Sequence, residues 1–307
     1  MKDKLIAVLM GGWNSEKEVS MRSGEAVYDA LIRLGYRACK INFSRNIFTD
    51  LQKIKPDIVF NALHGKFGED GCVQGMLDIL NIPYTHSGLL ACAICMDKTL
   101  SAKMAKCFNI NIPKAAILEK NNLQNETIIA EIGKPFVIKP VCDGSSVGVE
   151  VILENDDFNI KKYEWKFGDK MIIEKYIAGQ EIQVAVMDGK ALGAIEVRPK
   201  KLFYDYECKY TTGMTEYVMP AEISKEKYDE VLKIATKIHE YFGCEGISRI
   251  DFILNNKNSG DNQFYFLETN THPGFTATSL VPKIAKYVGI SFENIVEYLI
   301  KSAKCKS

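Results

Sequence analysis

The pattern of apolar and polar positions begins with a strand, a glycine-rich loop and a helix. Residues 5–10 form a continuous apolar run that ends at Gly11 and Gly12, which predicts a buried parallel strand entering a tight turn. Apolar residues between positions 26 and 34 then follow the helical period, and Gly35 ends that helix. The loop lacks G-x-G-x-x-G, and no acid follows at the ribose-binding spacing, so a dinucleotide site is not indicated.

Two more short strands are predicted at residues 37–43 and 57–63, and a helix follows the second at residues 72–80. Strands that alternate with helices form a small open parallel sheet, with functional loops at the carboxyl ends of the strands. Two candidate residues lie in such loops. Glu16 follows the first strand, although with Ser20 it could simply cap the helix. His64 directly follows the strand at residues 57–63. Although a lone histidine is more often structural, the glycines beside it allow a ligand to approach closely.

The segment after residue 97 contains positive charge beside a donor-rich loop. Lys98 lies in the first turn of a predicted helix, where a cation opposes the helix dipole. Lys139 ends a short strand, and the loop that follows contains Ser145 and Ser146 among glycines. Backbone N–H and hydroxyl groups of this kind bind phosphates, although a plain surface turn is the simpler alternative. The Walker pattern is missing, so a P-loop protein is not indicated.

Further along, residues 171–176 and the segment after Glu181 have strand patterns, and Asp188-Gly189 predicts a tight hairpin turn. Residues 198–213 show no period but contain many aromatic and basic residues. Such a segment is usually a functional loop or lid that could close over an anion. The alternative, a disordered loop, fits poorly with so many aromatic residues. A helix is expected at residues 222–242.

A predicted hairpin near the end of the chain carries the most specific chemistry. Arg249 and Asp251 alternate onto one face of the first strand, and Glu268 and Asn270 share one face of the returning strand. If these faces coincide, two carboxylates and an amide oxygen converge, which suits Mg²⁺ and the phosphates that accompany it. An edge hairpin with solvated acids is the alternative. The turn through Pro273 and Gly274 directly after the strand favours a site.

Composition narrows the class of protein. A chain of 307 residues predicts two or three domains. The formal net charge is zero, from 39 basic and 39 acidic residues, so nothing indicates a nucleic-acid or membrane partner. The nine cysteines are scattered, which indicates reduced thiols. Neither a signal peptide nor a membrane span is predicted, and we expect a cytoplasmic protein.

These residues form an ordered set of motifs. They include G-G-x-x-x-E-x-E-V-S at 11–20, A-L-H-G-x-x-G-E-D-G at 62–71, K-P-x-x-x-G-S-S-V-G at 139–148, F-Y-D-Y-E-x-K-Y at 203–210 and L-E-x-N-T-x-P-G at 267–274. In them the chain resembles the D-alanine–D-alanine ligase family of the ATP-grasp superfamily over essentially its whole length. The resemblance implies an α/β, ATP-grasp fold with an N-terminal Rossmann-like (pre-ATP-grasp) parallel-sheet domain at residues 1–96. A central ATP-grasp subdomain with the phosphate loop would follow at 97–180, and a C-terminal subdomain with the metal site and lid at 181–307.

The resemblance also implies an activity and its small-molecule partners. The enzyme would join two D-alanines through an acylphosphate, using ATP and two Mg²⁺ ions, with Mn²⁺ as an alternative, for peptidoglycan precursors. It would work as a homodimer. A D-serine or D-lactate acceptor is one alternative, and a non-catalytic nucleotide-binding regulator is a remoter one. Tyr210 favours D-alanine as the acceptor, while His272, Trp13 and Cys142 depart from the usual family pattern.

The family roles transfer to this chain by motif. Asp251, Glu268 and Asn270 would be the metal ligands. Glu16 would bind the first ammonium group, Ser145 would link Glu16 to Tyr210 over the closed site, and His64 would assist at the first carboxylate. Arg249 and Gly274 would stabilise the tetrahedral oxyanion, Ser279 and Leu280 would receive the second carboxylate, and Val19 and Ser20 would adjoin the substrate. The residues implied around ATP are Lys98, Lys139, Ser146, Glu174, Lys175, Tyr176, Ile177, Glu181, Phe203, Lys209 and Leu267.

Overall fold

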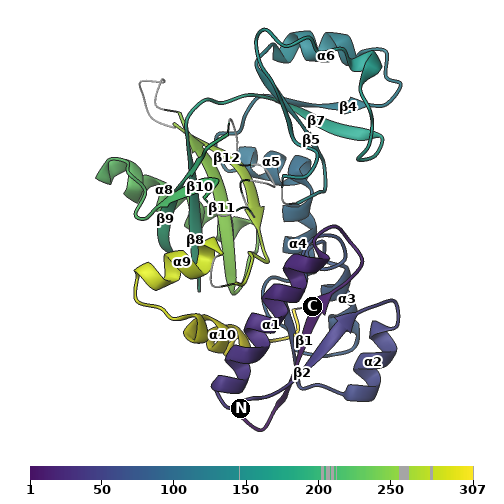
Figure 1. Ribbon diagram of the computed structural model, residues 1–307, viewed down its shortest axis with the longest axis vertical. Helices are drawn as coiled ribbons and strands as arrows, with labels where there is room; N and C mark the ends of the chain where they lie inside the picture. Colours follow the sequence, from purple (N-terminus) through teal and green to yellow (C-terminus); the bar gives the residue numbers. More distant parts are fainter. Residues whose placement is uncertain are drawn as a thin grey trace.

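A computed structural model describes residues 1–144, 146–201, 204, 208, 211, 213–255, 263–276 and 279–306. Within these ranges the strands form a three-stranded, a four-stranded and a five-stranded sheet. The three-stranded and four-stranded sheets lie toward opposite ends of the molecule, and the five-stranded sheet lies beside both (Figure 1). The predictions for Phe203, Lys209 and Tyr210, and the prediction for Ser145, concern residues outside these ranges.

The first sheet is parallel, as predicted. It consists of β1 (Leu5–Gly11), β2 (Arg37–Phe43) and β3 (Ile58–Asn61) in the order β2-β1-β3. Alternate residues of β1 enter two different cores, because Ile6 and Val8 pack toward α1 (Lys17–Arg33) while Ala7 and Leu9 pack toward α2 (Ile47–Ile54). Burial on both faces explains the continuous apolar run of this strand. The helix α1 begins nine residues before the apolar period that predicted it (26 − 17), because its first turns are polar.

The end of the chain also packs against this first sheet. The helices α3 (Cys72–Ile79) and α4 (Leu89–Met96) follow β3 in the sequence. After α9 (Leu280–Tyr287), the helix α10 (Phe292–Lys301) lies beside α1. Tyr84 pairs with Val59 of β3 on one side and with Lys304 on the other, so both chain termini lie at the first sheet (Figure 1).

The four-stranded sheet is antiparallel in the order β4-β7-β5-β6, from β4 (Ala115–Glu119), β7 (Lys170–Lys175), β5 (Phe136–Pro140) and β6 (Glu150–Ile152). The helix α6 (Asn125–Ile132) and the short 3₁₀ helix η1 (Ile160–Lys162) cover one face, where Phe136 and Ile138 pack. Since side chains alternate along β5, Val137 and Lys139 face the other side, toward a cavity. The helix α5 (Lys98–Cys107) precedes this sheet in the sequence.

The five-stranded sheet is antiparallel in the order β10-β9-β8-β11-β12. Its strands are β8 (Gln180–Met187), β9 (Lys190–Pro199), β10 (Thr215–Val218), β11 (Ile247–Leu254) and β12 (Phe264–Asn270). Asp188 and Gly189 have φ angles of 53° and 67°, which confirms the predicted hairpin turn between β8 and β9. The helix α8 (Lys225–Tyr241) covers the apolar face, and Ser224 caps its N-terminus. None of the helices in the described part of the chain is long and apolar enough to cross a membrane.

Candidate active site

The predicted hairpin forms, and its polar faces coincide. In the ladder between β11 and β12, Arg249 lies opposite Asn270 and Asp251 lies opposite Glu268. The Arg249 guanidinium donates to both carboxylate oxygens of Asp251, through Nε and Nη2 at 2.8 Å each. Burial by itself would lower the pKa of Arg249, but the charge and hydrogen bonds of Asp251 raise it above its ordinary value. The convergence of these four side chains is therefore confirmed.

A β-bulge in β12 changes which residues face the site. Asp251 pairs with Glu268, but the next residue, Phe252, pairs with Phe266, so Leu267 is left without a partner in the ladder. At a bulge, two residues oppose one on the neighbouring strand, and regular alternation is interrupted. As a result, the consecutive residues Leu267 and Glu268 both line the same cavity.

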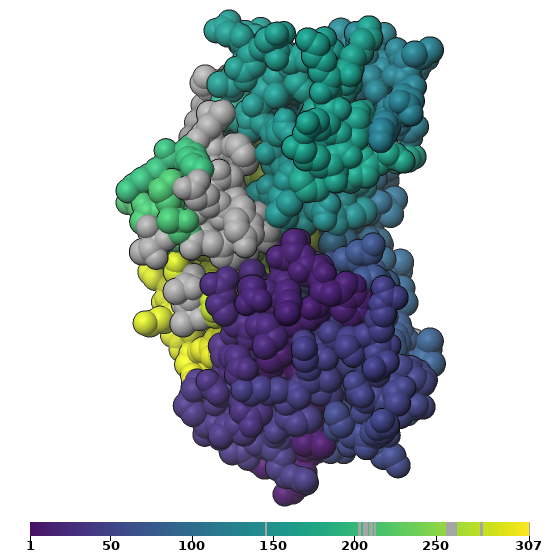
Figure 2. Space-filling view, turned by 45° about the vertical axis from the view of Figure 1, so that its right-hand side comes forward, coloured from purple at the N-terminus to yellow at the C-terminus, as the bar shows by residue number. Residues whose placement is uncertain are grey.

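Two cavities meet at this hairpin. The smaller, of about 160 Å³, lies between the four-stranded sheet and the hairpin, and the larger, of about 290 Å³, lies between the hairpin and the loops of the first sheet. Lys98, Asp143, Tyr204 and Glu268 line both cavities and form their common wall. In Figure 2, the purple N-terminal part and the teal four-stranded part face each other across the molecule.

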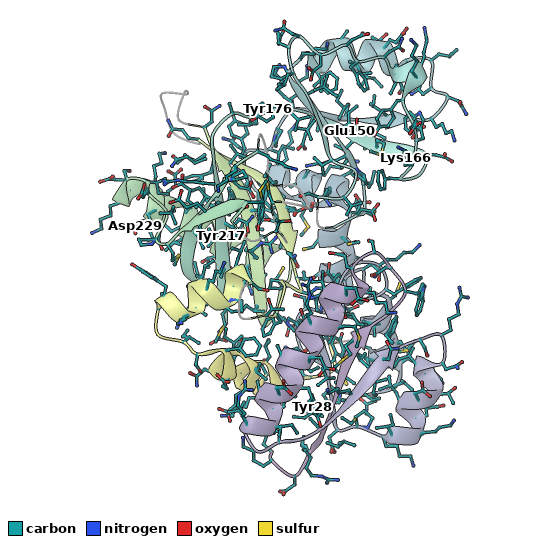
Figure 3. All side chains as sticks on the ribbon, in the orientation of Figure 1. Tyr28, Glu150, Lys166, Tyr176, Tyr217 and Asp229 are labelled. Atoms are coloured by element: carbon teal, nitrogen blue, oxygen red, sulfur yellow. The ribbon has the colours of Figure 1, made fainter. Side chains whose placement is uncertain are left out.

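The structure brings most of the predicted site residues to these cavities. Figure 3 places Tyr176 beside the four-stranded sheet and Tyr217 on the five-stranded sheet. Predicted residues at the smaller cavity are Lys98, Lys139, Ser146, Glu174, Lys175, Tyr176, Ile177, Glu181, Asp251, Leu267 and Glu268. Predicted residues at the larger cavity are Glu16, Val19, His64, Lys98, Arg249, Glu268, Asn270, Gly274, Ser279 and Leu280.

Lysine ammonium groups surround the smaller cavity. Lys98 begins α5, and its Nζ donates to the Asp143 carbonyl at 2.6 Å and lies 3.4 Å from a Glu268 carboxylate oxygen. Lys139 is buried and its Nζ lies 2.7 Å from Glu174 on the adjacent strand β7. Two buried or half-buried cations held by carboxylates can neutralise an incoming polyphosphate without moving far.

Glu16 lies at the boundary between three loops. It directly precedes α1, and its side chain is buried. A Cβ on Gly65 would lie 2.5 Å from Glu16 Oε2, and a Cβ on Gly144 would lie 2.9 Å from the same oxygen. Only glycine fits at either place without displacing the carboxylate. The Glu16 carboxylate is thus held at the wall of the larger cavity, where it can bind an ammonium group.

His64 bridges two other elements of the site. Its Nδ1 lies 3.0 Å from Glu69 Oε1, and its Nε2 lies 2.9 Å from Ser23 Oγ. Burial alone would lower the pKa of His64, but the hydrogen bond and charge of Glu69, together with the charge of Glu16, raise it. Ser23 Oγ in turn accepts the Phe275 N–H at 3.2 Å. Both ring nitrogens therefore have protein partners, and His64 helps to hold the loop after β12.

The loop after β12 and the start of α9 form the far wall of the larger cavity. Ser279 precedes α9, and its Oγ accepts the Thr276 N–H at 3.1 Å. A Cβ on Gly274 would lie 3.0 Å from Ser279 Oγ, so the glycine permits this close approach. The first turn of α9 has backbone N–H groups without intrahelical acceptors. Such groups can bind a substrate carboxylate beside Leu280.

Ser20 differs from the other substrate residues that were predicted. It is buried, accepts the Gly11 N–H and donates to the Ala62 carbonyl, both at 2.9 Å, and the described lining of the larger cavity does not include it. The described lining also includes residues that were not predicted, among them Arg22, Glu69, Asp143 and Tyr217. Glu69 lies within the motif that contains His64, and Asp143 lies within the motif at 139–148, and these motifs were the available signals. Tyr204 lies in the segment predicted as a lid, and it also lines the cavity.

The chemistry of the predicted metal ligands fits a hard cation. Among the described residues, no group of three or more His, Cys, Asp or Glu side chains is arranged to hold a metal ion. The predicted set instead combines two carboxylates, from Asp251 and Glu268, with the amide oxygen of Asn270. These are all oxygen donors on one face of neighbouring strands, beside the common wall of the cavities. Oxygen donors of this kind are the ligands of Mg²⁺.

A cleft between two antiparallel sheets, next to a Rossmann-like parallel sheet, is the architecture of the ATP-grasp ligases. Comparison with known proteins is more specific. The profile described as "D-ala D-ala ligase C-terminus" matches residues 104–301, and the profile described as "D-ala D-ala ligase N-terminus" matches residues 40–87. The chain belongs to the D-alanine–D-alanine ligase family, whose members form a C–N bond.

Individual relatives agree with this assignment over the whole chain. The chain is 48% identical to a D-alanine–D-alanine ligase of Rickettsia bellii over 306 residues, which cover 99% of this chain and 93% of the relative. The solved ligase of Bacillus anthracis is 35% identical with a TM-score of 0.84, covers 97% of each chain, and has also been solved in complex with ATP. The D-Ala:D-Ser ligase VanG of Enterococcus faecalis is 28% identical, with a TM-score of 0.81, and the alignment covers 97% of this chain and 99% of VanG.

Proposed function

We propose that this chain is a cytoplasmic enzyme that joins two D-alanines into D-alanyl-D-alanine at the expense of ATP, for peptidoglycan precursors. The observation that carries the proposal is the common wall of the two cavities at Lys98 and Glu268. Phosphoryl transfer needs the nucleotide and its acceptor to meet at one charged boundary. The 48% identity to a curated D-alanine–D-alanine ligase supports the choice of substrate.

In the first step, the smaller cavity would hold ATP and the larger cavity the first D-alanine. Glu16 would bind the ammonium group of that D-alanine, which directs its carboxylate toward Lys98. A carboxylate oxygen then attacks the γ-phosphorus, the bond to the β-phosphate oxygen breaks, and an acylphosphate and ADP result. Lys98 and Lys139 would neutralise the phosphate charge, since this chemistry depends mostly on positioning and charge stabilisation.

In the second step, the unprotonated amine of the second D-alanine attacks the acylphosphate carbonyl. The tetrahedral species then breaks its C–O bond to phosphate, and the departing phosphate takes up the proton that the nitrogen loses. Arg249, with the backbone of Gly274, would stabilise the oxyanion. The amide groups at Ser279 and Leu280 would receive the carboxylate of the second D-alanine. The roles proposed for Ser145, Phe203, Lys209 and Tyr210 belong to residues outside the described ranges.

Asp251, Glu268 and Asn270 would hold the two Mg²⁺ ions, which when bound supply charge neutralisation on the phosphates. The ion pair between Arg249 and Asp251 keeps this face organised.

We further propose that the chain forms a homodimer, as the family resemblance implies. Ile79 and Leu90 have exposed fractions of 82% and 70%, and they provide apolar surface for such an interface. Light scattering of the purified protein would test the dimer.

The experiment that tests the function is phosphate release from Mg·ATP with D-alanine or with L-alanine, with the product identified by mass. We expect phosphate release that depends on D-alanine, together with the mass of D-alanyl-D-alanine. Glu268→Gln should lower this rate at least about 100-fold, since it removes a charge at the common wall. Glu126→Gln, on the surface of α6, is the matched control and should keep the wild-type rate.

Other products would change the conclusion in defined ways. A mixed product with D-serine or D-lactate, at neutral pH and in place of the dipeptide, would keep the mechanism and overturn the proposed acceptor. Tight ATP binding without phosphate release under any pairing would instead indicate a non-catalytic regulator.

A further inference from the structure

The loops that follow β1 and β3 meet at the wall of the larger cavity. Because β1 and β3 are neighbouring parallel strands, their carboxyl ends lie at the same edge of the sheet. The first loop leads to Glu16, and the second contains His64. Both side chains line the larger cavity, so the distance between these loops sets the shape of the site proposed for the first D-alanine.

The side chain of Asn14 links the two loops through hydrogen bonds. Its Nδ2 donates to the His64 carbonyl at 2.8 Å and to the Lys66 carbonyl at 3.0 Å. Its Oδ1 accepts the Glu16 N–H at 3.0 Å. The amide group therefore holds the backbone of Glu16 with one end and the backbone on both sides of Gly65 with the other.

We infer that Asn14 is a positioning residue for the first-substrate site, because it fixes the Glu16 carboxylate relative to the His64 loop. The inference rests on the proposed function and deepens it. The described lining of the larger cavity does not include Asn14, so it acts through Glu16 and His64 without touching the substrate. Its influence should fall on D-alanine and not on ATP, whose proposed cavity lies on the far side of Lys98.

Close contact between the loops makes this link sensitive. A Cβ on Gly65 would lie 2.5 Å from Glu16 Oε2 and 3.2 Å from Asn14 Nδ2, so the loops touch without spare room. The neighbouring Trp13 adds a second contact between them. Its ring stacks on Phe43, with centroids 5.2 Å apart, and lies 5.3 Å from the ring of Phe67 in the second loop. A shift of either loop would therefore displace the carboxylate.

Binding can be measured by calorimetric titration with D-alanine, and Trp13, three residues from Glu16, adds a local fluorescence signal. The chain has two tryptophans, Trp13 and Trp165, and Trp165 packs in the four-stranded unit. In a Trp165→Phe background, the fluorescence of Trp13 can be followed while D-alanine is added without ATP. We expect Asn14→Ala to raise the Kd for D-alanine about tenfold, because the three hydrogen bonds that hold the Glu16 loop against the His64 loop are lost. Asn14→Ser keeps an acceptor for the Glu16 N–H, but its single hydroxyl cannot replace both amide donors, so it should raise the Kd comparably.

A matched control separates this role from general loop stability. Asn159 Oδ1 accepts the N–H of Lys161, two residues later, at 2.9 Å, which is the same local turn in the four-stranded unit. Asn159→Ala should leave the Kd for D-alanine unchanged. In steady-state assays of the full chain, Asn14→Ala should raise the KM for D-alanine about tenfold and leave the KM for ATP within about twofold.

Two results would overturn the inference alone. One is a Kd for D-alanine within about twofold of wild type in Asn14→Ala, and the other is wild-type binding in Asn14→Ser, which would reduce Asn14 to a local turn residue. If the wild-type protein neither binds D-alanine nor releases phosphate in its presence, the proposed function fails, and this role fails with it.

Discussion

At the scale of single residues, His239 shows how burial makes stability depend on pH. It lies on α8 with an exposed fraction of 4%, and its Nδ1 is 2.7 Å from Ser248 Oγ. Burial lowers the pKa of His239 from 6.5 to about 4. The neutral ring is therefore favoured in the folded state, and the reaction does not use it.

The sign of the resulting pH dependence follows from this direction. Below pH 6.5 the unfolded chain binds a proton at His239 that the folded chain does not bind until about pH 4, so stability is lost as the pH falls through this window. We expect His239 to remove about 2 kcal/mol of unfolding free energy between about pH 7 and about pH 5. Urea denaturation at both pH values measures this loss of unfolding free energy.

His239→Gln is the comparison for that measurement. The glutamine can still bond to Ser248 but cannot take up a proton, so the variant should lose less stability between the two pH values. An equal loss in wild type and His239→Gln would contradict this assignment.

At the scale of elements, the bulge in β12 decides the shape of the smaller cavity. Phe264 and Phe266 pack into the core beside α8, and Asp251 still pairs with Glu268 beyond the bulge. Deletion of Leu267 would therefore restore regular alternation, with Glu268 opposite Asp251 as before. We expect this deletion variant to fold and to keep the hairpin, but to bind ATP about tenfold more weakly, because one apolar wall of the cavity is lost. Calorimetric titration with Mg·ATP measures the change.

Leu267→Ala separates the side chain from the backbone irregularity. It keeps the bulge, so it should weaken ATP binding less than the deletion does. Unchanged ATP affinity in the deletion variant would show that the bulge does not shape the nucleotide site.

At the scale of the whole molecule, the last residues tie distant segments together. The Tyr84 N–H donates to the Lys304 carbonyl at 3.3 Å, and the Lys306 N–H donates to Asp78 Oδ1 at 2.8 Å. The Lys306 side chain is buried, donates to the His86 carbonyl and lies 3.6 Å from Glu245, just before β11. These contacts join the first sheet to the five-stranded sheet.

Truncation after Ser302 removes all of these contacts at once. We expect it to lower the unfolding free energy by about 3 kcal/mol, since several hydrogen bonds and a partly buried ion pair are lost. Urea denaturation of the full and the truncated chains measures the difference.

Lys306→Met is the control. It removes the Lys306 side-chain contacts with His86 and Glu245 but keeps the pairing of Tyr84 with Lys304, so it should cost less stability than the truncation. A truncated chain as stable as the full one would contradict the role of the tail.

Local patterns in the sequence determined the elements and much of the site. The apolar run of β1 predicted a buried parallel strand, Asp188-Gly189 predicted a tight turn, and the alternation along residues 249–254 and 264–270 predicted a polar face. These features depend on periods of two or 3.6 residues and on the allowed φ of glycine, all of which are local properties. The motifs then placed the chain in its family.

Only the tertiary structure decided how these parts engage one another. The bulge at Leu267 depends on the strand that pairs with β12, and the link of Asn14 to residues 64 and 66 depends on a neighbouring loop. His64 acquires partners at Ser23 and Glu69, and the tail at Lys304 joins Tyr84, across separations of up to 220 residues (304 − 84). No local period encodes contacts between segments so far apart, because packing and hydrogen-bond geometry select them only when the whole chain has folded.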